Sequence, residues 1–181
     1  MKAKLKTKYL LIPIVAFMLG ILTSNIIPSS TPAVSEGILY HGVVCVQTST
    51  GFKECNHNII VNNGKEYIEK LLVGQATAGA KQIALGNSSS TLQPTDTALP
   101  NEFANGCSLT NATGAYVDAG TGQWNITYQW TSGCDSVLLN STALYNATAG
   151  SNPVLFAEAT FTGTTLSNND KINVTWGIYV S

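Results

Sequence analysis

Three segments of the chain alternate apolar and polar residues with a period of two, which is typical of strands that bury one face. They span residues 123–131, 154–162 and 171–180. Their tryptophans are most simply explained as core residues, although a row of aromatic side chains can also form a platform for a ligand. The apolar positions that share a face within each segment are Trp124, Ile126, Tyr128, Trp130, Leu155, Ala157, Ala159, Phe161, Ile172, Val174, Trp176, Ile178 and Val180.

Shorter apolar segments complete a mainly β pattern. Residues 43–48 and 52–56 flank a Thr-Gly turn and predict a hairpin, and residues 81–86 predict a further strand. About seven to nine short strands, each closed by Gly, Asn or Ser turns, are typical of a β-sandwich. We therefore expect residues 43–181 to form one β-sandwich domain.

One segment has helical periodicity. Residues 65–73 carry apolar side chains at a spacing of three to four. Asn63 and Gly64 supply a start signal, and Gly74 supplies a stop. The sandwich is thus expected to contain one short helix.

The first part of the chain has the pattern of an export signal. Four lysines precede an apolar run over residues 9–22, and small and polar residues follow it. A basic stretch, an apolar run of about 7–15 residues and a small-residue exit describe a secretory signal peptide. We expect residues 1–24 to be this signal, with cleavage between residues 24 and 35, and residues 25–42 to form an N-terminal tail. The alternative is a membrane anchor, which needs about 20 apolar residues.

The composition excludes some classes of partner. Only 10% of the 181 residues are charged, arginine is absent, and Thr, Ser and Asn together make 52 residues. Such a surface cannot neutralise a row of phosphates, so a nucleic-acid partner is disfavoured. The part beyond the predicted signal contains five lysines and ten acids, hence a net charge of −5. We expect a weakly acidic, exported protein.

The four cysteines all lie beyond the predicted signal. An even number in an oxidising compartment predicts two disulfides, with three possible connectivities. Because Cys45 and Cys55 flank the predicted hairpin, we expect the pairs Cys45–Cys55 and Cys107–Cys134. The alternative, a zinc site, lacks a C-x-x-C pair and has unevenly spaced ligands. Its candidate ligands are Cys45, Cys55, His41 and His57.

Asn-x-Ser/Thr sequons are more frequent than chance predicts, though only modestly. All lie beyond the predicted signal, and most lie in polar turns or on the outward side of predicted strands, which favours an exported glycoprotein. N-linked glycans would also keep a surface so poor in charge soluble. The six predicted acceptors are Asn87, Asn111, Asn125, Asn140, Asn146 and Asn173.

No constellation for catalysis is apparent. An active site needs a nucleophile, a base and a group that orients the base. The two histidines lie in the first third of the chain, and no G-x-S-x-G, H-E-x-x-H or phosphate loop occurs. Asp96 is explained equally well as the cap of a helical turn over residues 95–103, and Asp170 as a turn residue. We expect no enzyme, no metal and no cofactor. The carboxylates considered are Asp96, Glu102, Asp118, Asp135, Glu158 and Asp170.

Three stretches together resemble a known family. They are HNIIVNNGKEYIEKLLVG (residues 57–74), IALGNSSSTLQPTDTALPNE (83–102), and residues 144–179, which end in LFAEATFTGTTLSNNDKINVTWGIY. Over residues 57–180 the order of these motifs is similar to that of archaeal extracellular thread and bundling-pilus subunits. The resemblance implies an immunoglobulin- or pilin-like sandwich that lacks one strand. The N-terminal tail of the next identical subunit would supply that strand, giving a head-to-tail homopolymer.

The tail of this chain has the composition that a donor strand requires. We expect a donor within residues 26–40, whose candidate side chains are Ile26, Ile27, Val34, Ile38, Leu39 and Tyr40. The acceptor is expected between two edge strands, one of them the terminal strand 171–180. The alternative is that residues 38–44 are simply the first strand of the domain's own sheet.

The resemblance implies an extracellular, cell-surface filament with a role in adhesion or biofilm formation, with no membrane contact after signal cleavage. Two rival functions remain open. One is a monomeric secreted or viral tail-like surface glycoprotein that binds a ligand. The other is a type IV pilin-like subunit that retains its apolar N-terminal helix.

Overall fold

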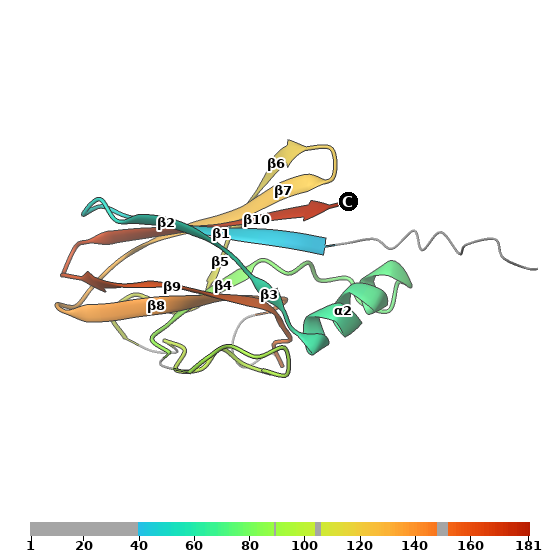
Figure 1. Cartoon of the computed structure of the whole chain (residues 1–181), viewed down its shortest axis with the longest axis horizontal. Coiled ribbons are helices and arrows are strands. Elements are labelled where there is room, and N and C mark those ends of the chain that lie inside the picture. Colours follow the sequence, from blue (N-terminus) through green and yellow to red (C-terminus); the bar gives the residue numbers. More distant parts are fainter. Residues whose placement is uncertain (1–39, 89, 104–105, 148–151) are drawn as a thin grey trace, which may run out of the picture. The chain divides into compact units, whose positions relative to one another are not determined.

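Two antiparallel sheets of five strands each pack face to face, which confirms the predicted β-sandwich (Figure 1). The computed structural model describes residues 40–88, 90–103, 106–147 and 152–181. The first sheet has the order β2-β1-β10-β7-β6, with β1 Tyr40–Thr48, β2 Lys53–His57, β6 Ala115–Gly120, β7 Gln123–Thr131 and β10 Lys171–Val180. The second has the order β3-β9-β8-β4-β5, with β3 Ile59–Ile60, β4 Gln82–Gly86, β5 Ala112–Thr113, β8 Val137–Tyr145 and β9 Leu155–Leu166.

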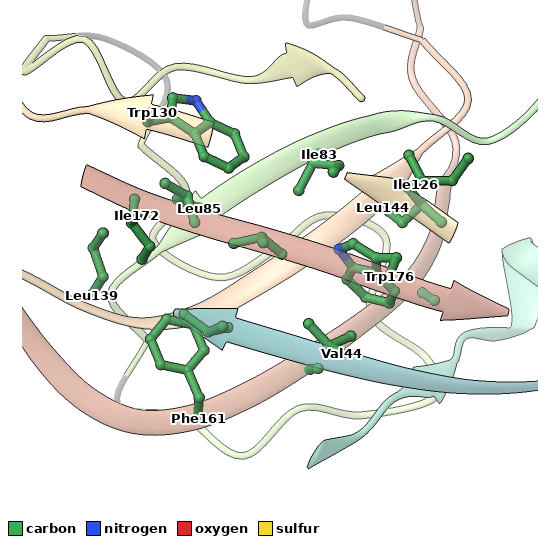
Figure 2. Close-up of a cluster of buried hydrophobic side chains, with 14 of the residues drawn as sticks. Val44, Ile83, Leu85, Ile126, Trp130, Leu139, Leu144, Phe161, Ile172 and Trp176 are labelled. Atoms are coloured by element: carbon green, nitrogen blue, oxygen red, sulfur yellow. The ribbon is translucent and has the colours of Figure 1, made fainter. Parts of the chain in front are cut away.

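The main core lies between the sheets and follows from the strand alternation. In β10, every second side chain from Ile172 to Ile178 is buried, with Trp176 at 0% exposure. These residues face Ile83, Leu85, Leu139 and Phe161 of the second sheet (Figure 2). Trp130 is also buried, and its Nε1–H donates to the carbonyl of Thr110 (2.8 Å). Trp130 and Trp176 are therefore core residues, as the alternation predicts.

Two strands depart from the predicted faces for local reasons. Tyr128 is 37% exposed because the pairing of β6 with β7 ends at Thr127, which leaves the ring at an open edge. Leu155 and Phe161 were expected on one face, yet they belong to different apolar clusters. A register shift between β8 and β9 at Leu144 and Tyr145 turns the start of β9 over, so Leu155 faces away from the main core.

The helix, α2, spans Asn62–Leu72 and begins earlier than predicted. Gly64 was expected to precede the helix but lies in its first turn. This turn packs so closely on β9 that a Cβ at position 64 would clash with the backbone carbonyl of Phe156. A small residue is thus what lets the helix start close to the sheet. Gly74 has a φ of 73° and follows the last turn, as predicted.

A long connection covers the outer face of the second sheet. This segment, residues 87–103, is called the strap, and residue 89 lies outside the described part. Leu92 and Leu99 of the strap are buried against Tyr145 and Leu155 in a second, smaller core. Asp96 does not cap a helical turn as expected. Its Oδ2 accepts from the backbone N–H of Gln93 (2.8 Å), and the surrounding residues form turns and irregular backbone.

Both expected disulfides are present. Cys45–Cys55 joins β1 to β2 with a Cα–Cα distance of 4.0 Å, and Cys107–Cys134 joins the connections before β5 and β8 at 5.0 Å. With their sulfurs bonded to each other, Cys45 and Cys55 offer no thiolates to zinc. Disulfides are typical of secreted and extracellular proteins.

We expect removal of Cys107–Cys134 by a double serine variant to lower the free energy of unfolding by about 3–4 kcal/mol, because this bridge closes the longer loop. Its cysteines are 27 positions apart, against 10 for Cys45–Cys55, whose strands already share a ladder of hydrogen bonds. Urea unfolding of both double variants measures the effects. A larger loss on removing Cys45–Cys55 would contradict this ranking.

Candidate functional site

An apolar groove opens at one end of the sandwich, between the first sheet and α2. It consists of two adjoining hollows of about 350 and 500 Å³. The start of β1, the end of β10 and α2 lie at this end (Figure 1). We call it the end groove, and it is lined by Tyr40, Ile60, Lys65, Ile68, Glu69, Leu71, Leu72, Val73, Gly79, Ala80, Lys81, Tyr116, Trp124, Ile126, Phe156 and Ile178.

The end groove is an opening into the main core. Ile126, Phe156 and Ile178 belong to that core and also line the wall of the groove. The helix covers this end only in part, since Leu72 and Val73 near its C-terminus are 66% and 63% exposed. Apolar side chains that contact water at the mouth of a core are typical of a site awaiting an apolar partner.

An exposed edge strand borders the groove. β6 is the last strand of the first sheet, and all six of its residues are exposed. Tyr116 of β6 lines the groove and is 64% exposed. A strand in this position presents backbone N–H and C=O groups to which another chain can pair. The groove therefore combines an apolar floor with a free sheet edge.

The edge of β9 near β2 is closed by side chains. The Asn56 amide donates to the carbonyl of Thr160 (2.9 Å), and a Glu54 carboxylate oxygen accepts from the N–H of Thr162 (2.9 Å). Burial raises the pKa of Glu54, but hydrogen bonds from Thr162 and Asn56 outweigh it and hold the pKa below its usual value. These contacts occupy backbone groups that a further strand would need, so β6 is the better acceptor edge.

The predicted donor residues fall almost entirely outside the described part of the chain. Ile26, Ile27, Val34, Ile38 and Leu39 lie there. Tyr40 begins β1, pairs with Val180 of β10 and lines both hollows of the end groove. Tyr40 is therefore part of the domain's own first sheet.

The expected acceptor wall needs correction. The terminal strand, β10, was expected at an edge, but it lies between β1 and β7 in the middle of its sheet. The groove-lining residues of α2 and Tyr116 of β6 were not predicted. The available sequence signal was a pair of consecutive apolar residues, Leu72 and Val73, at the end of an amphipathic helix. Both are exposed in the structure.

Two of the three predicted core tryptophans are buried, and the third lines the site. Trp124 is half-buried in the wall of the end groove. It packs at the start of β7, directly opposite Ile178 of β10. An aromatic wall of this kind suits apolar side chains of a partner.

All six predicted glycan acceptors have half-buried side chains, and three of them are hydrogen-bonded. The Asn140 side chain accepts from the N–H of Ser88 and donates to its C=O, both at 2.7 Å. Asn146 accepts from the N–H of Val154 (2.7 Å), and Asn173 accepts from the Thr127 hydroxyl (3.1 Å). The other acceptors are Asn87, Asn111 and Asn125. Glycan attachment at all six stays a prediction.

The remaining polar candidates serve turns or lie apart. Asp118, Asp135 and Asp170 each accept a backbone N–H at 2.8–3.0 Å within or between turns. His41 is exposed and stacks on Tyr179, with ring centroids 5.2 Å apart, and His57 is exposed on β2. Among the described residues, no group of three or more His, Cys, Asp or Glu side chains could hold a metal ion. Asp96 and Glu102 belong to the strap, and Glu158 belongs to β9.

Comparison of the chain with protein-family models, with curated proteins and with solved structures found no match. Within the described part, no helix is both long and apolar enough to span a bilayer. The filament interpretation consequently rests on the residues and geometry of this chain.

Proposed function

We propose that the protein is a structural subunit of an extracellular filament, in which the N-terminal tail of one copy enters the end groove of the next. The single observation that carries this proposal is that the main core is open to solvent beside an unpaired strand. Burial of apolar surface and pairing of a free edge are the two gains that strand addition provides. The end groove offers both at one place.

The tail is chemically matched to the groove. Residues 25–39 include five apolar aliphatic side chains larger than alanine and a single charge, Glu36. Pro28 and Pro32 lack the N–H that strand pairing needs, so pairing by the tail is expected to use the residues beyond Pro32, which include Val34, Ile38 and Leu39. The few charged groups along the groove, Lys65, Glu69 and Lys81, leave its floor apolar.

The reach of the tail fits a contact between copies. β1 begins at Tyr40, which itself lines the groove. Fifteen residues in extended conformation span roughly 50 Å, enough to leave one domain and enter another. Because the tail and the groove are different surfaces, the contact is heterologous, and a heterologous contact that does not close builds a fibre. Adhesion or biofilm formation is the role proposed for this fibre.

Location and surface chemistry are compatible with this role. Two disulfides suit an extracellular protein, and glycans on the predicted acceptors would keep the charge-poor surface soluble. The competing functions would use the same surfaces differently. A monomeric binding protein would fill the groove with a ligand against Trp124, and a type IV pilin-like subunit would assemble through residues 9–22.

N-terminal sequencing of subunits purified from surface filaments tests the proposal. We expect the mature chain to start between residues 25 and 35. A start near residue 25 keeps the whole tail as donor, and a start at residue 35 keeps only its end, with Ile38 and Leu39. A start near residue 9 would show a retained apolar helix and would favour type IV assembly. Absence of the protein from filaments, with a soluble monomer in the medium, would favour a binding protein.

A further inference from the structure

A buried carboxyl group lies beneath the strap without a well-formed hydrogen bond to either of its oxygens. Glu158 of β9 has 0% exposure, and neither of its carboxyl oxygens has a hydrogen-bond partner when the group is ionised. It points to the outer face of the second sheet, in the row formed by Ile59 and Ala143. A buried ionised carboxylate without a donor is costly, so this site calls for a proton or a cation.

The group opposite Glu158 is a second carboxyl. The side chain of Asp96 on the strap is within hydrogen-bonding reach of Glu158. Two ionised carboxylates only accept, so no hydrogen bond joins them until one of them is protonated. The backbone N–H of Gln93 donates to Asp96 (2.8 Å) and also contacts Glu158. An N–H aimed at the pair opposes a cation there. It also lowers the pKa of Glu158, but burial and Asp96 raise this pKa by more, so the carboxyl keeps a proton.

We propose that Asp96 and Glu158 form a pH-sensitive latch, in which one shared proton holds the strap on the second sheet and loss of this proton releases it. The proposal is independent of the filament function. Burial, followed by the hydrogen bond and the charge of Asp96, raises the pKa of Glu158 from its ordinary value of 4.5 to about 8. Related pairs of carboxyl groups share one proton because both cannot ionise at close range.

The groups around the latch anchor the strap and supply no positive charge that would neutralise the two carboxyl groups. Tyr145 of β8 donates its hydroxyl to Glu102 (2.8 Å) and accepts from the N–H of Leu99 (2.7 Å), which anchors the strap beside the pair. β3, which pairs with β9 at Glu158, and β4, which lies beyond β8 in the same sheet, contain no titratable residue. His57 of β2 borders a hollow beside Leu92 of the strap and is itself exposed. All five lysines of the described part are exposed, so none neutralises the buried pair.

The latch connects to the end groove through the helix. The N–H of Asn62, the first residue of α2, donates to the carbonyl of Pro94 in the strap (2.7 Å). Release of the strap removes this contact from the helix that lines the groove. Through this contact, a change of external pH that releases the strap would also alter the support of α2 at the end groove.

The sign of the effect follows from linkage. A carboxyl whose pKa is higher in the folded state keeps its proton after the unfolded chain has lost it, so folding stability falls as pH rises. The contribution is complete below about pH 4.5 and is lost as pH rises to about 8. Above this range the shared proton is absent and the strap is released from the second sheet.

The test follows two readouts on the mature, disulfide-bonded protein between pH 5 and pH 9. One is the melting temperature, and the other is cleavage within residues 87–103 by proteinase K, located by mass spectrometry and normalised to an unfolded substrate at each pH. We expect the wild type to melt lower and to be cleaved in the strap faster as pH rises. Glu158→Gln keeps a donor toward Asp96 at every pH, so both of its profiles are expected to be flat across this range. Asp96→Asn, which donates to Glu158 from the other side, serves if Glu158→Gln does not fold.

The matched control is Glu102→Gln, which alters a carboxyl of the strap outside the pair and is expected to retain the pH dependence. Wild-type profiles that are flat, or that persist unchanged in Glu158→Gln and Asp96→Asn, would overturn the latch. Protection of the strap that is restored at pH 9 by calcium and lost at pH 6 in EDTA would replace the proton with a cation and would also overturn it.

Discussion

Replacing Leu72 or Tyr116 by aspartate is expected to abolish filament assembly while leaving the domain folded. Leu72 is 66% exposed and Tyr116 is 64% exposed, so each change falls on a surface position of the isolated subunit. Substitutions at such positions usually alter stability by within about 0.5 kcal/mol. In the assembled state the same side chain would be covered by the tail of the next copy. An unpaired buried charge there costs about 3–5 kcal/mol, enough to remove most of the affinity of one contact.

Leu138→Asp is the matched control for both variants. Leu138 is an exposed leucine on β8, 42% exposed, and it does not line the end groove. We expect filaments from Leu138→Asp and only monomers from Leu72→Asp and Tyr116→Asp, by size exclusion and electron microscopy. Normal filaments from both groove variants would show that assembly uses another surface. Loss in all three would indicate a general effect of added charge.

Deleting residues 25–39 is expected to lower the thermal and detergent resistance of the protein by a large margin. In the filament, each subunit would be stabilised by the tail that fills its groove. Occupancy at about 1,000 times the dissociation constant adds about 4 kcal/mol, which raises the melting temperature of a domain of this size by roughly 10 °C. The deletion leaves β1 intact from Tyr40 onward, so the monomer is still expected to fold.

Calorimetry of wild-type filaments and of the deletion variant measures this difference, with both disulfides intact in each sample. A synthetic peptide of residues 25–40, added to the deletion variant, is expected to recover part of the lost stability. The same peptide with Ile38 and Leu39 replaced by serine is the control. Equal melting temperatures for the wild type and the deletion variant would contradict the role of the tail in the contact between subunits.

The sequence was most informative where one face of a strand is buried and the other is exposed. β10 alternates without interruption, and its buried positions follow the prediction from Ile172 to Ile178. β8 escaped prediction because Asn140, Ser141 and Thr142 interrupt its apolar pattern. In the fold these polar residues are buried or half-buried, and two of them bond to the backbone of Ser88 and Ala84. Only tertiary contacts reveal that a polar run of this kind is a strand.

The candidate site was less predictable because its parts are distant in the chain. The end groove joins α2 to Tyr116 of β6, Trp124 of β7 and Ile178 of β10, and nothing local in the sequence indicates that they meet. Glu158 alternates with Ala157 and Ala159, so the pattern places it on the outer face of a sheet, where water would be expected. The strap covers that face, and a loop's path over a sheet cannot be read from periodicity.

The most direct test of the filament proposal is negative-stain electron microscopy of material sheared from cells that express the wild type or the variant lacking residues 25–39. The proposal predicts thin filaments from the wild type and secreted monomers without filaments from the variant. Filaments from both would contradict assembly through the tail. Filaments from neither would contradict the structural role and would favour a monomeric surface protein with a ligand in the end groove.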